Sequence, residues 1–197
     1  MGVGHVNWPG YVVYYTGLKL IESLPRVVKV VLNIGGELRV CVKVESLSLV
    51  LRFLRGHTSF QFVSLLDMVG IDYPVRRRRF EVVYCLTSLF LNLRIQVVVN
   101  VGELQWLPSI TALYSSSGWL ERELWDMYGI FFRGHPDLRR ILTDYGFEGF
   151  PLRKDFPLTG FNEVRYDDEK CTIVYEPLEV AQEFRYFDFV SPWQFRY

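Results

Sequence analysis

Three acids and one histidine near the middle of the chain are residue types that can carry out acid–base chemistry. Glu121, Glu123 and Asp126 fall within one predicted helix, and His135 follows in the turn Gly134-His135-Pro136-Asp137. A carboxylate beside a histidine can move protons in a hydrolase. Glu121 and Glu123, however, lie about 200° apart around a helix axis and cannot converge on one reacting atom. We therefore expect helix-dipole and ion-pair roles for these acids.

The turn that contains His135 also has a structural interpretation, which we favour over a ligand site. Arg139 and Arg140 follow the turn directly. A bend held by a histidine–backbone hydrogen bond and by arginine–acid pairs accounts for all of these residues. His5 and His57 are isolated, so the spacing predicts no histidine-based metal site.

Cysteine spacing and glycine motifs argue against the common cofactor sites. Cys41, Cys85 and Cys171 lie far apart, so no CxxC pair or cluster-binding run is present. An odd, sparse cysteine count also suits a reducing compartment. The sequence has no GxGxxG, GxxxxGK[ST] or GxSxG motif. Any redox or hydrolytic chemistry connected with this chain is therefore expected to be carried out elsewhere.

The charge balance argues against nucleic acid and membrane-surface partners. The chain has 22 Lys and Arg and 22 Asp and Glu, so it has no strong net field. Residues 144–197 nevertheless hold eleven acids and six bases, which leaves a basic body with an acidic tail. The run Arg76 to Arg79 is expected to form a solvated turn, with contact to an acidic neighbouring subunit as the second interpretation. No stretch approaches the ~18 apolar residues that a membrane span needs.

Hydrophobic periodicity predicts an α+β fold in which an antiparallel or mixed sheet is backed by helices. Helices are expected over residues 11–24, 47–56 and 117–129. Strands are expected over residues 28–32, 38–44, 60–63, 80–86 and 93–101, with Gly35-Gly36 turning the first two into a hairpin. In the third helix Arg122 is expected to face Asp126 one turn later.

The pattern changes after residue 143. Residues 144–197 contain four prolines and fourteen aromatic residues, without a sustained helical or strand period. We therefore predict a body over residues 1–143 and, over residues 144–197, an extended aromatic- and proline-rich arm that docks on a partner subunit. The predicted aromatic anchors are Phe147, Phe150, Phe156, Phe161, Phe184, Phe187, Phe189 and Trp193.

A long part of the chain resembles the 30 kDa subunit family of respiratory complex I. The resemblance is carried by WLERELWDMYGIFF at residues 119–132 and GHPDLRRIL at 134–142, and continues through TDYGFEG, PLRKDFPL, EVRYD, FDF and SPW. DYP at 72–74 and RFEVVY at 79–84 extend it upstream, so it covers about residues 60–195 well. Two departures are Phe150, where a histidine is expected before Pro151, and Ser115-Ser116-Ser117-Gly118 in place of Pro-Ser-Ala-Asn.

The resemblance implies a structural subunit in the peripheral arm of proton-translocating NADH:ubiquinone oxidoreductase, without catalytic residues of its own. It implies contact with the 49 kDa-type subunit and other peripheral-arm subunits. It is also compatible with a complex that forms part of a respiratory supercomplex. FMN, iron–sulfur clusters and ubiquinone would belong to partner subunits, with no cofactor in this chain. The family signature and expected subunit interface comprise Glu121, Arg122, Glu123, Asp126, Gly129, His135, Pro136, Arg139, Arg140, Asp144, Gly146, Phe147, Arg153, Asp155, Phe156, Phe189 and Trp193.

Location and alternatives follow from the same resemblance. Residues 1–10 lack the features of a signal or transit peptide, and the length resembles the mitochondrially encoded subunit 9 type. We expect the matrix side of the mitochondrial inner membrane, with the bacterial cytoplasmic face second. The alternatives are a related subunit of a membrane-bound hydrogenase or plastid-type complex, a soluble adaptor, and a stand-alone hydrolase using Glu123 and His135.

Overall fold

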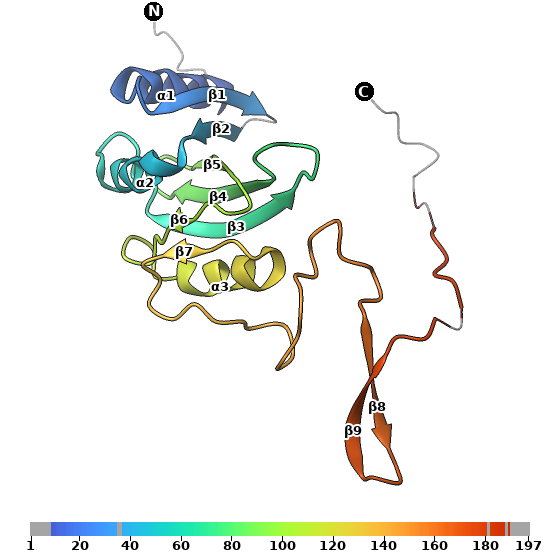
Figure 1. Ribbon diagram of the computed structural model, residues 1–197. Helices are drawn as coiled ribbons and strands as arrows, with labels where there is room; N and C mark the ends of the chain where they lie inside the picture. The colour runs from blue at the N-terminus through green and yellow to red at the C-terminus, as the bar shows by residue number, and fades with distance from the viewer. Residues whose placement is uncertain (1–8, 35–36, 181, 188, 190–197) are drawn as a thin grey trace, which may run out of the picture. The chain divides into compact units, whose positions relative to one another are not determined.

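The chain forms two compact units, Met1–Phe156 and Pro157–Tyr197. A computed structural model describes residues 9–34, 37–180, 182–187 and 189 (Figure 1). The division falls after Phe156 and not after residue 143, because residues 144–156 pack within the first unit. The acidic arm is therefore shorter than the sequence pattern indicated.

A five-stranded mixed sheet forms the centre of the first unit. Its strands are β1 (Val28–Ile34), β2 (Glu37–Val42), β3 (Ser64–Asp72), β4 (Phe80–Ser88) and β5 (Leu93–Val101). They lie in the order β1-β2-β5-β4-β3; β2 and β5 are parallel, and the other neighbours are antiparallel. The predicted mixed sheet is confirmed, as is the β1–β2 hairpin, although Gly35-Gly36 themselves lie outside the described residues.

Three α-helices in the described part of the chain cover this sheet. They are α1 (Pro9–Ser23), α2 (Leu47–Gly56), which follows a short 3-10 turn η1 (Val44–Ser46), and α3 (Ser117–Tyr128). Helix α1 lies along β1, and α3 lies against β3 (Figure 1). Leu20, Leu51 and Leu124, one from each helix, belong to the same buried cluster as Val97 and Val99 of β5. The helices thus share one hydrophobic core.

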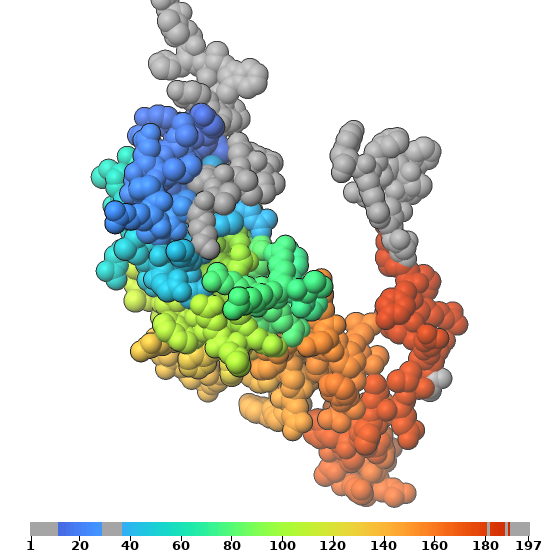
Figure 2. Space-filling view, turned by 45° about the horizontal axis from the view of Figure 1, so that its top comes forward, coloured from blue at the N-terminus to red at the C-terminus, as the bar shows by residue number. Residues whose placement is uncertain are grey.

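The space-filling view shows the elements of the first unit packed side by side, from α1 in blue to β4 in green (Figure 2). Two expectations in this region are wrong. Residues 60–63 form a turn and no strand, because the N–H groups of Phe60 and Gln61 both donate to the His57 carbonyl. Gln61 has φ 47°, a left-handed value that a strand does not allow. The helical spacing of apolar residues in the helix expected over residues 11–24 also predicts that Ile21 is buried, but this side chain is 44% exposed.

Two smaller sheets complete the described structure. Strands β6 (Leu107–Pro108) and β7 (Phe132–Arg133) pair in parallel, and β8 (Asn162–Asp167) and β9 (Thr172–Pro177) form an antiparallel hairpin in the second unit. The sequence pattern showed no strand period in the arm, so this hairpin corrects it. Each strand has only six residues, too few for a sustained alternation. Within the described residues, no helix has the length and apolar character needed to cross a bilayer.

Gly70 allows α3 to approach β3 closely, and this position yields a stability prediction. The Tyr128 hydroxyl donates to the Gly70 carbonyl at 2.7 Å, and a Cβ at residue 70 would lie 2.8 Å from the Tyr128 ring. Gly70→Ala is therefore expected to lower the free energy of unfolding by about 1–3 kcal/mol, because the ring must shift. Urea unfolding followed by circular dichroism measures this.

Gly56→Ala is the control for this change, since a Cβ at residue 56 meets nothing within 4 Å. It should change the free energy of unfolding by no more than about 1 kcal/mol. Equal effects of the two substitutions would contradict the close approach of α3 to β3.

Candidate functional site

The family-signature residues gather along α3 and along the segment that follows it. We call residues 134–156 the post-α3 segment; it contains no helix or strand and belongs to the first unit. Gly129, at φ +76°, ends α3 in a left-handed cap, as the sequence predicted. An irregular segment needs side-chain partners for its backbone groups, and the signature residues supply several of them.

Asp126 is the main anchor of the post-α3 segment. One of its carboxylate oxygens accepts the N–H groups of Ile141, Leu142 and Thr143, at 3.2, 2.8 and 2.9 Å. The other accepts the Thr143 hydroxyl at 2.7 Å and pairs with Arg140 at 3.1 Å. The Asp126 side chain is fully buried. Burial alone would raise the pKa of this carboxyl, but the Thr143 hydroxyl and the three N–H groups together hold it below its usual value.

Arg122 does not pair with Asp126, so that expectation is wrong. Its guanidinium donates to the carbonyls of Arg139 at 3.0 Å and Arg140 at 3.3 Å. It also lies 5.2 Å from the ring of Trp119. Arg122 and Asp126 therefore hold the same stretch of backbone from two sides, one through its carbonyls and the other through its N–H groups.

Arg153 and Phe150 close the C-terminal end of α3. Arg153 donates to the Tyr128 carbonyl at 2.7 Å, and its guanidinium lies 4.4 Å from the Phe150 ring. Phe150 packs edge-on against Trp125 at 6.1 Å. A Cβ at Gly129 would come within 2.6 Å of the Phe150 ring, so only glycine fits there. Phe150, one of the two departures from the family pattern, is thus part of a packed aromatic contact.

A second network joins the post-α3 segment to the sheet. Arg79 makes two bonds to Asp72, at 2.7 and 2.9 Å, and pairs with Glu103 and Asp155 at 3.0 Å each. The N–H of Lys154 donates to Asp72 at 2.8 Å. The hydrogen bond from Arg79 is the main reason that the pKa of Asp72 is lowered, although burial opposes it.

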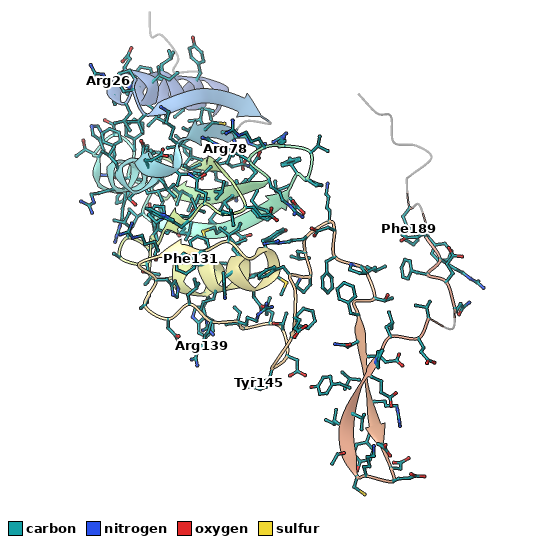
Figure 3. The ribbon with its side chains drawn as sticks, in the orientation of Figure 1. Arg26, Arg78, Phe131, Arg139, Tyr145 and Phe189 are labelled. Carbon is teal, nitrogen blue, oxygen red and sulfur yellow. The ribbon has the colours of Figure 1, made fainter. Side chains whose placement is uncertain are left out.

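The run Arg76 to Arg79 is therefore only partly a solvated turn. Arg76, Arg77 and Arg78 are all exposed, although Arg76 also pairs with Glu81 at 3.1 Å and lies 3.7 Å over the ring of Tyr73. Figure 3 labels Arg78 among these side chains. The expectation of a solvated turn is wrong for Arg79, because two of its acidic partners, Glu103 and Asp155, come from distant parts of the chain that sequence spacing does not bring together.

Glu121 and His135 lie next to one another in the interior. Glu121 accepts the N–H of Ile110 at 2.8 Å, and its other oxygen lies 3.9 Å from the His135 ring. Burial raises the pKa of Glu121. The Glu121 side chain is fully buried, whereas Glu123, two residues on, is exposed, and the contact with His135 fits the expected ion-pair role if the ring is protonated. Residue spacing along the chain carries no signal for this contact.

His135 makes the backbone bonds that the structural interpretation predicted. Its Nδ1 accepts the N–H of Asp137 at 3.0 Å, and its Nε2 lies 3.1 Å from the Gly118 carbonyl. Arg139 pairs with Asp137 at 3.0 Å, which confirms the arginine–acid pairing in this turn. The His135 and Glu121 side chains are 3% and 0% exposed, so a substrate has no access to them. This buried pair therefore supports the fold.

The other predicted site residues divide between the two units. Asp144 accepts the N–H of Tyr145 at 2.8 Å, Gly146 has φ +72°, and Phe147 lies 5.9 Å from Phe156. The residues Pro136 and Arg139 are in the exposed turn before them, and Figure 3 shows Arg139 and Tyr145 pointing away from α3. Phe189 in the second unit is 91% exposed, and Trp193 lies outside the described residues.

Three of the predicted anchors thus contact their own chain: Phe147, Phe150 and Phe156 pack within the first unit. All three are half-buried, and their docking into a partner's pockets stays a prediction. Among the described side chains, no group of three or more His, Cys, Asp and Glu residues is placed to hold a metal ion. That cofactors reside in other subunits stays a prediction.

These observations define a class before any comparison: an α+β protein in which signature residues on and after α3 hold the backbone of its own first unit. Comparison with known proteins identifies the family. The pattern of the family described as respiratory-chain NADH dehydrogenase, 30 Kd subunit, matches residues 40–162. The chain belongs to this family.

Relatives agree with this assignment, and one solved structure shares the fold. The chain is 61% identical to an NADH-quinone oxidoreductase subunit of Sinorhizobium medicae (strain WSM419), over 81% of this chain and 79% of that protein. It is 51% identical to NADH-ubiquinone oxidoreductase subunit 9 of Reclinomonas americana, over 90% and 87%. A chain from the membrane-bound sulfane sulfur reductase, an archaeal respiratory membrane complex, is similar with TM-score 0.62 and 22% identity, over 74% of this chain and 85% of that one. This last likeness shows the fold.

Asp126→Asn is expected to lower the free energy of unfolding at neutral pH by about 3 kcal/mol, because a buried acceptor of five hydrogen bonds loses its charge. The pKa of Asp126 is lowered in the folded state, so its contribution is complete above the pKa of the unfolded chain and is lost as the pH falls through the folded-state value. The difference between wild type and variant should therefore shrink between about pH 5 and pH 2. Urea unfolding at each pH measures it.

Asp137→Asn provides the matched control. Asp137 pairs with Arg139 but is 61% exposed, so the change should cost no more than about 1 kcal/mol. A similar loss in both variants would show that Asp126 does not anchor the segment.

Proposed function

We propose that this chain is a non-catalytic structural subunit in the peripheral arm of proton-translocating NADH:ubiquinone oxidoreductase. The observation that carries the proposal is the use of the signature residues: Asp126, Arg140 and Arg153 bind backbone carbonyls, N–H groups or acids of this same chain. The family match over residues 40–162 supports the assignment of the chain to this complex. Other subunits of that complex are then its partners, and NADH oxidation, electron transfer and quinone reduction belong to them.

The second unit is the part proposed to dock on the 49 kDa-type subunit. Phe184, Phe187 and Phe189 are 53%, 69% and 91% exposed, and Phe161 is 62% exposed. Large exposed aromatic side chains of this kind are common anchors of protein interfaces. FMN, the iron–sulfur clusters and ubiquinone would be held by partner subunits.

The contribution to rate would be indirect. Electron transfer and quinone chemistry depend on the placement of the reacting groups, and a displacement of about 1 Å can lower the rate severely. A rigid first unit, tied by the Asp126 and Arg79 networks, suits a subunit that fixes the positions of its neighbours.

We place the subunit at the membrane surface, on the matrix side of the mitochondrial inner membrane, with the bacterial cytoplasmic face as the second location. The similarity to a mitochondrial-type subunit 9 supports the first, and 61% identity to a bacterial NADH-quinone oxidoreductase subunit supports the second. A hydrogenase or plastid-type complex has less support, since both of these relatives are NADH dehydrogenase subunits.

Deletion of residues 157–197 tests the proposal. It should block assembly of the complex and should not yield an assembled enzyme with a lower turnover. The cut follows Phe156 because an earlier one, after Asp144, also removes Phe150 and Arg153 from the first unit. Native electrophoresis with NADH dehydrogenase activity staining gives the result.

Glu22→Gln is the matched control, because Glu22 is an exposed acid on α1 outside both networks and outside the expected subunit interface. It should leave assembly and activity unchanged. Glu123→Gln tests the alternative, since a stand-alone hydrolase that used Glu123 would lose activity in the purified chain. A full-size complex that turns over slowly after the deletion would contradict the proposed role of the arm.

A further inference from the structure

The β8–β9 hairpin has one apolar face and one charged face. Residues paired directly across an antiparallel ladder lie on the same face, and residues along a strand alternate between faces. Val164 is paired with Tyr175, and Tyr166 with Ile173, so these four residues share one face. We call it the apolar hairpin face. The hairpin is the twisted orange ribbon in Figures 1 and 3.

The side chains of this face are exposed to an unusual degree. Val164, Tyr166, Ile173 and Tyr175 are 56%, 59%, 64% and 56% exposed within the described chain. An apolar surface of this kind, on adjacent paired residues, is a feature of interaction sites. A two-stranded hairpin is at best marginally stable in water without a surface to pack against. The face therefore requires an apolar partner surface.

The opposite face, apart from Val174, and the turn are polar, and several of their charged groups have partners within the hairpin. Arg165 makes two bonds to Glu176, at 2.9 and 2.7 Å. Asp167 accepts the N–H groups of Glu169 at 3.0 Å and Lys170 at 3.3 Å, which shapes the turn. These groups already have partners of their own, so this face is suited to water and the apolar hairpin face to the partner.

The charge of the hairpin restricts the kind of partner. Residues 162–177 contain five acids, Glu163, Asp167, Asp168, Glu169 and Glu176, and only two bases, Arg165 and Lys170. The turn acids Asp168 and Glu169 lie beyond one end of the apolar hairpin face, and their charge is complementary to Lys and Arg beside the partner's apolar surface. The same charge opposes binding to an anionic membrane.

We propose that the apolar hairpin face packs on an apolar surface, bordered by basic side chains, of another protein subunit of the same complex. The inference rests on the proposed function and deepens it by naming the face that docks and the chemistry of the surface that receives it. The Arg165–Glu176 face then points to solvent. The exposed aromatic residues after the hairpin, among them Phe184 and Phe187, extend the same contact along the arm.

Val164→Asp and Val174→Asp form a matched pair of variants. Both make the same change in the same hairpin, but Val164 is on the apolar hairpin face and Val174 is paired with Arg165 on the other. Each variant replaces the wild-type chain in cells, and the complex is separated by native electrophoresis after a salt wash. Mass spectrometry then measures the ratio of this chain in the active band to this chain in the whole extract. Val164→Asp should lower that ratio about tenfold, and Val174→Asp by no more than about twofold.

Two further variants address folding of the hairpin and the sign of the charge. Ile173→Ser adds no charge and should also lower the ratio, by less than Val164→Asp. Asp168→Asn combined with Glu169→Gln removes two acids from the turn and should make retention in the complex less sensitive to salt between about 0.05 and 0.5 M. Unchanged salt sensitivity would overturn the proposal that basic side chains border the partner's apolar surface.

The outcomes separate this inference from the function it rests on. If the wild-type chain is absent from the active band, the proposed function fails. If the wild-type chain is present and the Val164 and Val174 variants are retained equally, the function stands and the apolar hairpin face is the wrong surface. Concentration-dependent self-association of the purified chain, lost in Val164→Asp, would assign the face to a second copy. Binding to phosphatidylcholine vesicles containing phosphatidylglycerol, lost in the same variant, would assign it to the membrane; either result overturns the proposal.

Discussion

The structure of the site depends on one carboxylate. Asp126 is buried on α3, and it receives the N–H groups of Ile141, Leu142 and Thr143, which belong to a segment with no helix or strand to satisfy them. A buried N–H without a partner is costly, so the path of the segment is set by where this acid lies. Arg140, held by the same carboxylate, then reaches the Gly149 carbonyl and fixes the next part of the segment.

Local patterns predicted most of the fold. The alternation of Ile95, Val97 and Val99 identified β5, and the stripe ending at Gly129 identified α3 with its correct C-terminus. Patterns of this kind report burial of one face, which is a property of neighbouring residues. The strand prediction for residues 60–63 was wrong because the pattern reports burial and not its cause. Phe60 and Phe62 are buried, but by the turn that follows α2 and not by a sheet.

The contacts of the site were less accessible to sequence reasoning. Arg79 lies in a basic run that resembles a solvated turn, and its partners Asp72, Glu103 and Asp155 are spread over the first unit. Glu121 occupies a helix position that suits an exposed acid, yet it accepts a hydrogen bond from Ile110 in a loop that packs over it. The signature residues could be identified by resemblance, but their roles depend on tertiary contacts between segments far apart in the sequence.

The bond between Lys154 and Asp72 also has a consequence for synthesis of the chain. Asp72 ends β3, but its backbone partner is 82 residues later, almost at the end of the first unit. When all five strands of the sheet have emerged from the ribosome, Lys154 has not yet been exposed, so the nascent chain still lacks its bond to Asp72. The first unit therefore acquires its final form only when residues 150–156 emerge, and the arm that follows them leaves the ribosome after the body has closed.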